Sequence, residues 1–492
     1  MRPILGGLIV FGTSAAVLAL EILAVRLLAP HLGITIEVTT GVIGTVLAGI
    51  ALGTWIGGRL ADQMDPRRLL GPILIIGGVL ALAVVPMVSL AARTGVGASP
   101  QGILIYAGAA FFLPAAVLSA ASPTIVKLQL HHVGQTGAIV GSYSAIGTTG
   151  AIFGSFLTGF VLVAALPTRP IVVGIGIALI VAGVLIAWRV GRARPTQIVA
   201  LAVVLGLGGA AWSIASPAPC QRESAYFCIS VEAASDDGRE RVLVMDTLRH
   251  AYVDLDDPTR LEFRYTRLLG DIADAIAPKG QPITALHLGG GGFTLPRYID
   301  ATRPGSLHRV LELDPVVLEV AQDELGLEAS QTLEVVIGDG RLGIADEPDG
   351  RYDLVIGDAF GGVAVPWHLT TTEFVSEVQR TLRPGGIYAA NIIDYPPLEL
   401  ARAQLATFAE VFEHAGVYGP ASLIDGDRGG NVILLASDEP LPEDAILQVS
   451  RARDGRDELV AGAAAVADFA ADAPVLRDDY APADQLLTRF SS

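Results

Sequence analysis

Four consecutive glycines, Gly289–Gly292, follow the apolar run ITALHL, and glycine lets a backbone approach a ligand that a side chain would block. Many α/β folds use such a turn only for tight packing, so the residues that follow matter. Glu312 ends the next apolar run 23 residues after Gly289, about where an acid hydrogen-bonds ribose hydroxyls in nucleotide-binding folds. Asp339, in GDGR after the third run, could accept a hydrogen bond from an adenine amino group. Together with Gly289, Gly290 and Gly291, the two acids predict an adenosine site.

The class of adenosine ligand is narrowed by what the sequence lacks. No phosphate-clamping lysine or P-loop is present, which argues against ATP and favours a ligand of the S-adenosylmethionine type. We expect no metal, because the histidines have no metal-ligand spacing and the two cysteines are eight residues apart. Packing or surface roles are expected for His250, His287, His308 and His368.

The elements that position these acids form a repeating pattern. Short aliphatic runs alternate with helix-like segments from residue 283 onward, which is typical of parallel strands covered by helices on both faces. We therefore predict a doubly wound, Rossmann-like α/β domain of the S-adenosylmethionine-transferase type, with its ligand at the carboxyl ends of the strands. A small β extension is expected at 241–255, and residues 456–487 are expected to form a helix, a proline-marked turn and a terminal segment.

The first part of the chain has a different composition. Apolar runs recur there at about the 20 residues that cross a bilayer as a helix, which predicts a multi-pass α-helical membrane domain. Glu21 and Arg26 lie within the first run, either near the interface or as a functional pair. Seven spans are expected, at about 4–28, 38–58, 70–92, 102–126, 137–165, 171–188 and 197–215.

Charge divides the chain in the same place. Residues 1–216 hold four acids and eleven Lys or Arg, so the remainder holds 46 acids and 22 bases out of the total of 50 and 33. We predict a membrane domain at 1–216, a linker with a small β segment at 217–280 and a nucleoside-binding domain at 281–492, in the plasma membrane and in contact with the lipid bilayer. So acidic a second domain excludes nucleic acid as a partner.

Basic residues near the span ends predict the orientation of the chain. Eight lie on the side of the N-terminus and three on the other, which favours a cytoplasmic N-terminus and an extracytoplasmic second domain. A disulfide between Cys220 and Cys228 would agree with an extracytoplasmic second domain, and two reduced thiols are the alternative. The eight are Arg2, Arg59, Arg67, Arg68, Lys127, Arg189, Arg192 and Arg194.

A family resemblance adds to these inferences. Residues 241–394 resemble the spermidine synthases, the polyamine aminopropyltransferases, through LHLGGGG, VLELDP, GDGR, YDLVIGDAF and LTTTEF…TLRPGGIYAAN. The full chain resembles the membrane-fused branch of that family, in which EILAVRLLAPHLG, LGTWIGGRLAD and LRDDYAPADQLL also occur.

The resemblance implies a reaction and a set of residue roles. Decarboxylated S-adenosylmethionine would donate an aminopropyl group to putrescine or another amine, with no permanently bound cofactor and with a homodimer as a possible assembly. Glu312 would bind ribose, Asp339 would lie on the adenine side, and Gly289 to Gly291 would lie beneath the nucleoside. Asp358 matches the first aspartate of the family's Asp-x-x-Asp-Pro segment, and Tyr265 matches the tyrosine of its Tyr-x-Glu segment.

The sequence departs from the family where acids would contact a cationic amine. Gly292, Gly361 and Arg267 stand in place of those acids, and a buried ammonium without carboxylate partners is unfavourable. Asp358 remains as a base, and Asp394 or the pair Asp478 and Asp479 are candidates to replace the lost carboxylates. Two other functions therefore stay open: a non-catalytic membrane protein that binds nucleosides or polyamines or assists transport, and a methyltransferase that uses S-adenosylmethionine.

Overall fold

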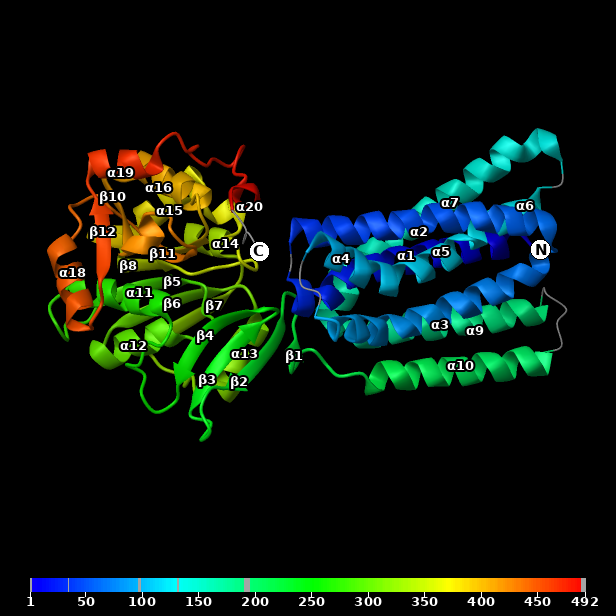
Figure 1. Ribbon diagram of the computed structural model, residues 1–492, viewed down its shortest axis with the longest axis horizontal. Coiled ribbons are helices and arrows are strands. Elements are labelled where there is room, and N and C mark those ends of the chain that lie inside the picture. The colour runs from blue at the N-terminus through cyan, green and yellow to red at the C-terminus, as the bar shows by residue number, and fades with distance from the viewer. Residues whose placement is uncertain (1, 34, 96–98, 131, 190–194, 488–492) are drawn as a thin grey trace. The chain divides into compact units, whose positions relative to one another are not determined.

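The computed structural model describes residues 2–33, 35–95, 99–130, 132–189 and 195–487. The chain forms two compact units, Met1–Cys228 and Ile229–Ser492, which are described separately below (Figure 1). Arg192, Arg194 and Ser492 lie outside the described residues.

The first unit is helical. Six segments are long and apolar enough to cross a bilayer: Pro3–Leu32, Ile36–Gln63, Pro66–Ala92, Gln101–Gln129, Val133–Ala165 and Thr168–Arg189. They coincide with the first six predicted spans. The seventh forms a helix in the expected place, but its apolar part, Ala200–Ala215, is shorter than the other six. The orientation inferred from seven spans stays a prediction.

These segments contain ten α-helices, two π-helical turns and one 3-10 turn within the described residues. The π-helical turns interrupt two of the long segments, a feature often found at functional sites. The elements are α1 (Pro3–Leu32), α2 (Ile36–Gln63), α3 (Pro66–Ala92), α4 (Pro100–Ala107), η1 (Gly108–Phe112), α5 (Leu113–Ser119), α6 (Ala121–Gln129), η2 (Val133–Gln135), α7 (Thr136–Phe156), η3 (Leu157–Leu162), α8 (Val163–Ala165), α9 (Thr168–Arg189) and α10 (Pro195–Ala215).

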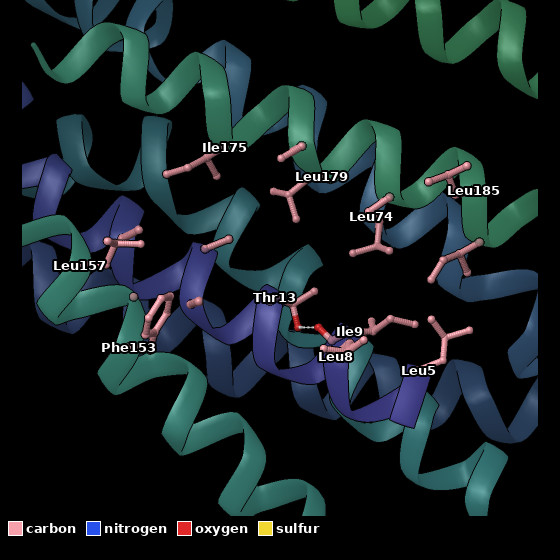
Figure 2. Close-up of a pocket in the computed structure, with 18 of the residues that line it drawn as sticks. Leu5, Leu8, Ile9, Thr13, Leu74, Phe153, Leu157, Ile175, Leu179 and Leu185 are labelled. Carbon is pink, nitrogen blue, oxygen red and sulfur yellow. Dashed lines mark hydrogen bonds between the residues drawn. The ribbon is translucent and has the colours of Figure 1, made fainter. Parts of the chain in front are cut away.

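Small residues let these helices pack closely, as is common between membrane helices. A side chain at Gly53 of α2, for example, would overlap the backbone of Ala116 in α5. An apolar pocket of about 510 Å³ lies among α1, α3, α7, η3 and α9 (Figure 2). Leu74 and Leu179 line it, and the Thr13 hydroxyl beside it donates to the carbonyl of Ile9 at 2.9 Å (Figure 2).

The last segment of the first unit is fixed by a disulfide and by Arg26. Cys220 and Cys228 are bonded, with their Cα atoms 5.5 Å apart, so the disulfide is confirmed and the reduced alternative is wrong. The Arg26 guanidinium lies 3.2 Å from the Glu223 carboxylate, in the two-residue strand β1 (Arg222–Glu223). Glu21 and Arg26 therefore do not form the functional pair considered from the sequence.

The second unit is a mixed α/β fold with a small antiparallel sheet, which confirms the predicted fold class. Its strands are β2 (Cys228–Ala233), β3 (Glu240–Met245), β4 (Leu248–Asp254), β5 (Thr284–Leu288), β6 (Leu307–Glu312), β7 (Leu333–Ile337), β8 (Tyr352–Gly357), β9 (Leu382–Asp394), β10 (His414–Pro420), β11 (Gly430–Ser437) and β12 (Asp457–Ala461). Strands β2, β3 and β4 pair antiparallel and contain the predicted β extension.

Helices cover both faces of the large sheet. One buried cluster joins the sheet to α15 and α16, and another joins its opposite face to α11, α12 and α18. The helical elements are α11 (Arg264–Ala275), α12 (Thr294–Thr302), α13 (Pro315–Glu324), α14 (Gly340–Ala345), η4 (Trp367–Leu369), α15 (Thr372–Thr381), α16 (Glu399–Val411), α17 (Ala421–Ile424), α18 (Glu443–Ala452), α19 (Ala463–Ala470) and α20 (Ala483–Leu486).

The order of strands locates the point where a ligand is expected. The large sheet runs β12-β10-β11-β9-β8-β5-β6-β7, with the five strands from β9 to β7 parallel (Figure 1). The chain proceeds from β5 to β6 and β7 on one side and returns to β8 and β9 on the other. Ligands of open α/β sheets bind at such a switch point, outside the carboxyl ends of the strands.

Two strands of this sheet were not predicted. β10 contains two glycines and a terminal proline, and β12 is a short strand at the sheet edge, so neither shows a long aliphatic run. Residues 457–461 were expected within a helix, and that expectation is wrong because they pair antiparallel with β10. The helix α19 begins only after them, at Ala463.

Candidate active site

The glycine turn lies at the switch point between β5 and β8. Gly289 follows β5 directly, and its N–H donates to the carbonyl of Leu311 at 2.9 Å, while the N–H of Asp358 donates to Leu288 at 2.9 Å. Gly289 has φ +95°, and a Cβ there would lie 2.6 Å from the carbonyl oxygen of Asp358. Any side chain would therefore displace the end of β8, so glycine is required to bring the two strand ends together.

Glu312 is held against this turn. Its buried carboxylate accepts hydrogen bonds from the N–H of Gly290 at 2.7 Å and from that of Asp314 at 2.8 Å. Burial raises the pKa of Glu312, although the backbone donors oppose the shift. These bonds fix the orientation of the carboxylate, and its remaining acceptor capacity suits a hydroxyl pair.

Asp339 lies two residues after β7, whose last residue, Ile337, pairs with Glu312 in β6. One of its oxygens caps α14 by accepting from the N–H groups of Arg341 and Leu342, at 2.8 and 3.2 Å. The other lies 3.2 Å from Nε2 of His368. The predicted adenine-side acid is therefore at the same sheet edge as Glu312, and His368, for which the sequence predicted a packing or surface role, lies beside it.

Asp358 lies just after β8 and contacts two side chains. The Nδ2 of Asn391 in β9 donates to Oδ1 of Asp358 at 2.8 Å, and the Nδ2 of Asn431 in β11 donates to Oδ1 of Asn391 at 2.9 Å. Burial raises the pKa of Asp358 to about 6, while the hydrogen bonds from Asn391 and Tyr265 act in the opposite direction. This carboxylate is ionised at neutral pH and can accept a proton from a reacting group.

Tyr265, in the first turn of α11, contacts Asp358 and the backbone of β4. Burial, and after it the charge of Asp358, raise the pKa of Tyr265 well above its ordinary range. Its hydroxyl donates to the carbonyl of His250 at 2.7 Å. The hydrogen bond between Tyr265 and Asp358 favours the charged form of this carboxyl group.

The three departures from the family pattern differ in their surroundings. A Cβ at Gly292 would lie 2.6 Å from that of Ala251 in β4, so no acid fits there. A Cβ at Gly361 would meet only ordinary contacts, the nearest being Pro366 at 3.7 Å. Arg267 is exposed, and its Nε donates to the carbonyl of Leu261 at 2.6 Å.

The acids considered as replacements are already bonded elsewhere. The buried Asp394 accepts from the N–H groups of Tyr395 and Ala401, at 2.8 and 2.9 Å. Asp478 accepts from Arg341 at 2.6 Å and from the Thr371 hydroxyl at 2.7 Å. Both carboxylates are therefore held by partners within the second unit. Asp479, beside Asp478, is exposed.

The remaining histidines have structural surroundings. His287 and His308 are buried and lie 3.1 Å apart through Nε2 and Nδ1, and burial lowers the pKa of both. Burial also lowers the pKa of His250 to about 4. In the part of the chain that the structure describes, no three His, Cys, Asp or Glu side chains form a metal-binding group.

Sequence comparison finds more than one polyamine aminopropyltransferase similar to this chain. No family model matches the chain. The polyamine aminopropyltransferase of Vibrio vulnificus is 31% identical over 193 residues, which cover 38% of this chain and 60% of that protein. The chain is aminopropyltransferase-like. This confirms the resemblance to the spermidine synthases, and the aligned part spans about three fifths of the relative's length.

Two further proteins are similar to parts of this chain. An eEF1A lysine and N-terminal methyltransferase of Danio rerio is 33% identical over 129 residues, or 24% of this chain and 19% of that protein. The crystal structure of a probable spermidine synthase from Corynebacterium glutamicum covers 51% of this chain and 94% of its own, with 28% identity and a TM-score of 0.47.

Proposed function

We propose that this protein is a membrane-anchored transferase that moves an aminopropyl group from decarboxylated S-adenosylmethionine to putrescine or another amine. The observation that carries the proposal is the grouping of Gly289, Glu312 and Asp358 at the β5–β8 switch point. The similarity to named aminopropyltransferases supports it.

The donor would be held by its adenosine part. Glu312, fixed by Gly290 and Asp314, would accept hydrogen bonds from the ribose hydroxyls. Asp339 and the neighbouring His368 would lie toward the adenine, and Gly289, Gly290 and Gly291 would lie beneath the nucleoside. Binding by these groups would fix the sulfonium relative to Asp358, and such positioning can supply a large share of the rate enhancement.

The proposed chemical step needs little beyond this positioning. The amine nitrogen forms a bond to the carbon beside the sulfonium, the carbon–sulfur bond breaks, and its electron pair leaves with the sulfur of methylthioadenosine. The proton lost by the amine goes to the Asp358 carboxylate, whose pKa of about 6 keeps it ionised at pH 7. Asn391 and Tyr265 position Asp358 for this transfer.

A second candidate function is methyl transfer from intact S-adenosylmethionine. Ala251 and Val253 occupy the space at Gly292 where the family places an acid for the donor's aminopropyl nitrogen. Intact S-adenosylmethionine carries a carboxylate beside its ammonium, so its side chain depends less on an acid from the protein at this position, and the relative from Danio rerio is named a methyltransferase. The identity of the nucleoside product distinguishes the two reactions.

The membrane part of the proposal rests on the first unit. Six helices of sufficient length and apolar character favour a multi-pass protein of the plasma membrane, and the disulfide favours an oxidising compartment for residues 220–228. We propose that α10 is a seventh span, which makes the second domain extracytoplasmic, and we keep the homodimer and the division at 1–216, 217–280 and 281–492 as parts of the same proposal.

The test is a product assay on the purified full-length protein. Decarboxylated S-adenosylmethionine is offered with putrescine or with n-butylamine, and products are identified by mass spectrometry. We expect methylthioadenosine together with the aminopropylated amine. The rate of product formation should fall at least about a hundredfold in Asp358→Asn, which is in the range typical for loss of a general base. Full activity in Asp358→Asn would refute the assigned base, and no product with either amine would refute aminopropyl transfer.

A further inference from the structure

A second pocket in the first unit is lined by hydroxyl groups. It measures about 340 Å³ and lies among α1, α2, α5, α6 and α7. Seven serines and threonines from four segments of the chain line it, in a unit whose helices are otherwise strongly apolar. One is Thr13, and the other six are Ser14, Thr54, Ser119, Ser122, Ser144 and Thr148.

These six hydroxyls have no partner among the described residues. Serines and threonines in membrane helices usually hydrogen-bond to their own helix or to a neighbour. The Thr13 hydroxyl behaves in that way, since it donates to Ile9 (Figure 2), and the Tyr143 hydroxyl donates to Pro3. None of the six makes a hydrogen bond within the described part of the chain, so their donors and acceptors are available to a ligand.

A carboxylate lies one turn from this pocket. Glu21 follows Val17 and Leu18 of α1 by four and three residues, and both of these line the pocket. That spacing places Glu21 on the same face of the helix, at the next turn. Arg26, the basic residue nearest in sequence, is bonded to Glu223 instead. Within the residues that the structure describes, Glu21 makes neither an ion pair nor a hydrogen bond.

The pocket and the carboxylate together indicate a ligand. An ionised side chain at membrane depth is unfavourable unless it has a partner, and it usually marks a path or a binding site. Hydroxyl oxygens and one carboxylate are acceptors, which suits a cation that carries N–H donors. A volume of about 340 Å³ is far larger than a bare metal ion needs and falls at the low end of the 300–1,000 Å³ range of small-molecule pockets.

We propose that the first unit binds a small organic cation, a protonated amine, with its ammonium held between Glu21 and the hydroxyl groups of the pocket. This site is separate from the one at the β5–β8 switch point, and the inference does not rest on the proposed transferase activity. The membrane unit would thus recognise an amine and would be more than an anchor.

The experiment measures binding of radiolabelled n-butylammonium by equilibrium dialysis to the full-length protein in lipid nanodiscs. All variants carry Asp358→Asn, so that the amine site of the second unit is weakened equally. We expect Glu21→Gln to weaken binding by about tenfold to a hundredfold, as loss of a charge-assisted hydrogen bond does. Thr54→Val and Ser119→Ala should each weaken it by about twofold to tenfold.

Two controls make the result decisive. Glu37→Gln makes the same chemical change at an exposed acid in the first turn of α2 and should bind as the parent does. Glu21→Asp keeps the charge and should retain most of the affinity, which separates loss of the charge from misfolding. Tetramethylammonium, which has no N–H donor, should bind at least about tenfold more weakly.

Three outcomes would overturn the proposal. Equal affinity in Glu21→Gln and Glu37→Gln would show that Glu21 holds no ammonium. Equal affinity for tetramethylammonium would show that the hydroxyls accept no hydrogen bond from the ligand. Displacement of n-butylammonium by millimolar sodium, with sodium uptake lost in Glu21→Gln, would assign the site to a metal ion.

Discussion

Replacing Asp358 by asparagine should inactivate the protein and stabilise its second unit at the same time. The pKa of Asp358 is about 6 in the folded protein, against an ordinary value of 3.8, because burial disfavours the charged form. The folded state therefore holds a proton that the unfolded state releases between these two pH values. Stability from this site is present below pH 3.8 and is lost as the pH rises through about 6.

The size of the effect follows from the shift. The difference between about 6 and 3.8 corresponds to about 3 kcal/mol at neutral pH, as an upper estimate. Asparagine has nearly the same shape, remains neutral, and can still accept the hydrogen bond from Asn391. We therefore expect Asp358→Asn to be more stable than the parent by up to about 3 kcal/mol at pH 7.5, and by little at pH 4.

Hydrogen exchange followed by mass spectrometry measures this locally, in peptides from β5 and β8. Parent and variant are compared at the same pH, so that intrinsic exchange rates cancel. Slower exchange in the variant at pH 7.5, with a difference that shrinks toward pH 4, is the expected result. Faster exchange at pH 7.5, or a difference independent of pH, would refute the assignment of a raised pKa to this carboxylate.

Three further predictions concern the groups around Asp358 and Glu312. Asn391→Leu removes a hydrogen-bond donor that stabilises the charged form of Asp358, so the pKa of Asp358 should rise. In a pH–rate profile, the acidic limb of kcat/KM should then move up from about pH 6 by about one pH unit, and an unmoved limb would contradict this role of Asn391. An aspartate fits at Gly361, so Gly361→Asp should lower the KM for putrescine by about tenfold. At Gly292 the new side chain would overlap Ala251, so Gly292→Asp should lower the free energy of unfolding by about 1–3 kcal/mol, as measured by thermal melting. A lower KM in Gly292→Asp together with a loss of stability in Gly361→Asp would contradict this geometry. Glu312→Ala should weaken methylthioadenosine binding in calorimetry by at least about tenfold, and unchanged affinity would remove Glu312 from the ribose site.

The sheet could be predicted from the sequence where its strands are buried on both faces. β5, β6 and β8 each contain buried aliphatic residues, and acids or glycines directly after such strands must gather at one edge when the strands are parallel. Glu312 and Asp339 could be placed by this argument alone. β10 and β12 lack the aliphatic signal, since glycines or charges interrupt them.

The contacts of Asp358 depend on features that no single segment reveals. Asn391 reaches Asp358 because β9 pairs with β8 in a register that aligns Ala390 with Gly357. A slip of one residue would turn Asn391 to the opposite face of the sheet. A polar residue inside the apolar run IYAANIID was the available signal, and it does not indicate which partner the side chain meets.

Contacts between residues far apart in the sequence also determine the partner of Arg26 and the space beside Gly292. Glu21 and Arg26 are five residues apart, yet Arg26 pairs with Glu223, almost 200 residues later in the sequence. The space beside Gly292 is filled by Ala251, which belongs to the preceding β extension. Sequence spacing alone carries no information on either contact.

The most direct test of the central claim is a competition between the two donors. Decarboxylated S-adenosylmethionine and S-adenosylmethionine are supplied together, at equal concentration, with putrescine and the full-length protein, and the nucleoside products are separated. The proposed function predicts methylthioadenosine that forms only when the amine is present and disappears in Asp358→Asn. S-adenosylhomocysteine as the sole nucleoside product would contradict aminopropyl transfer and assign the site to methyl transfer.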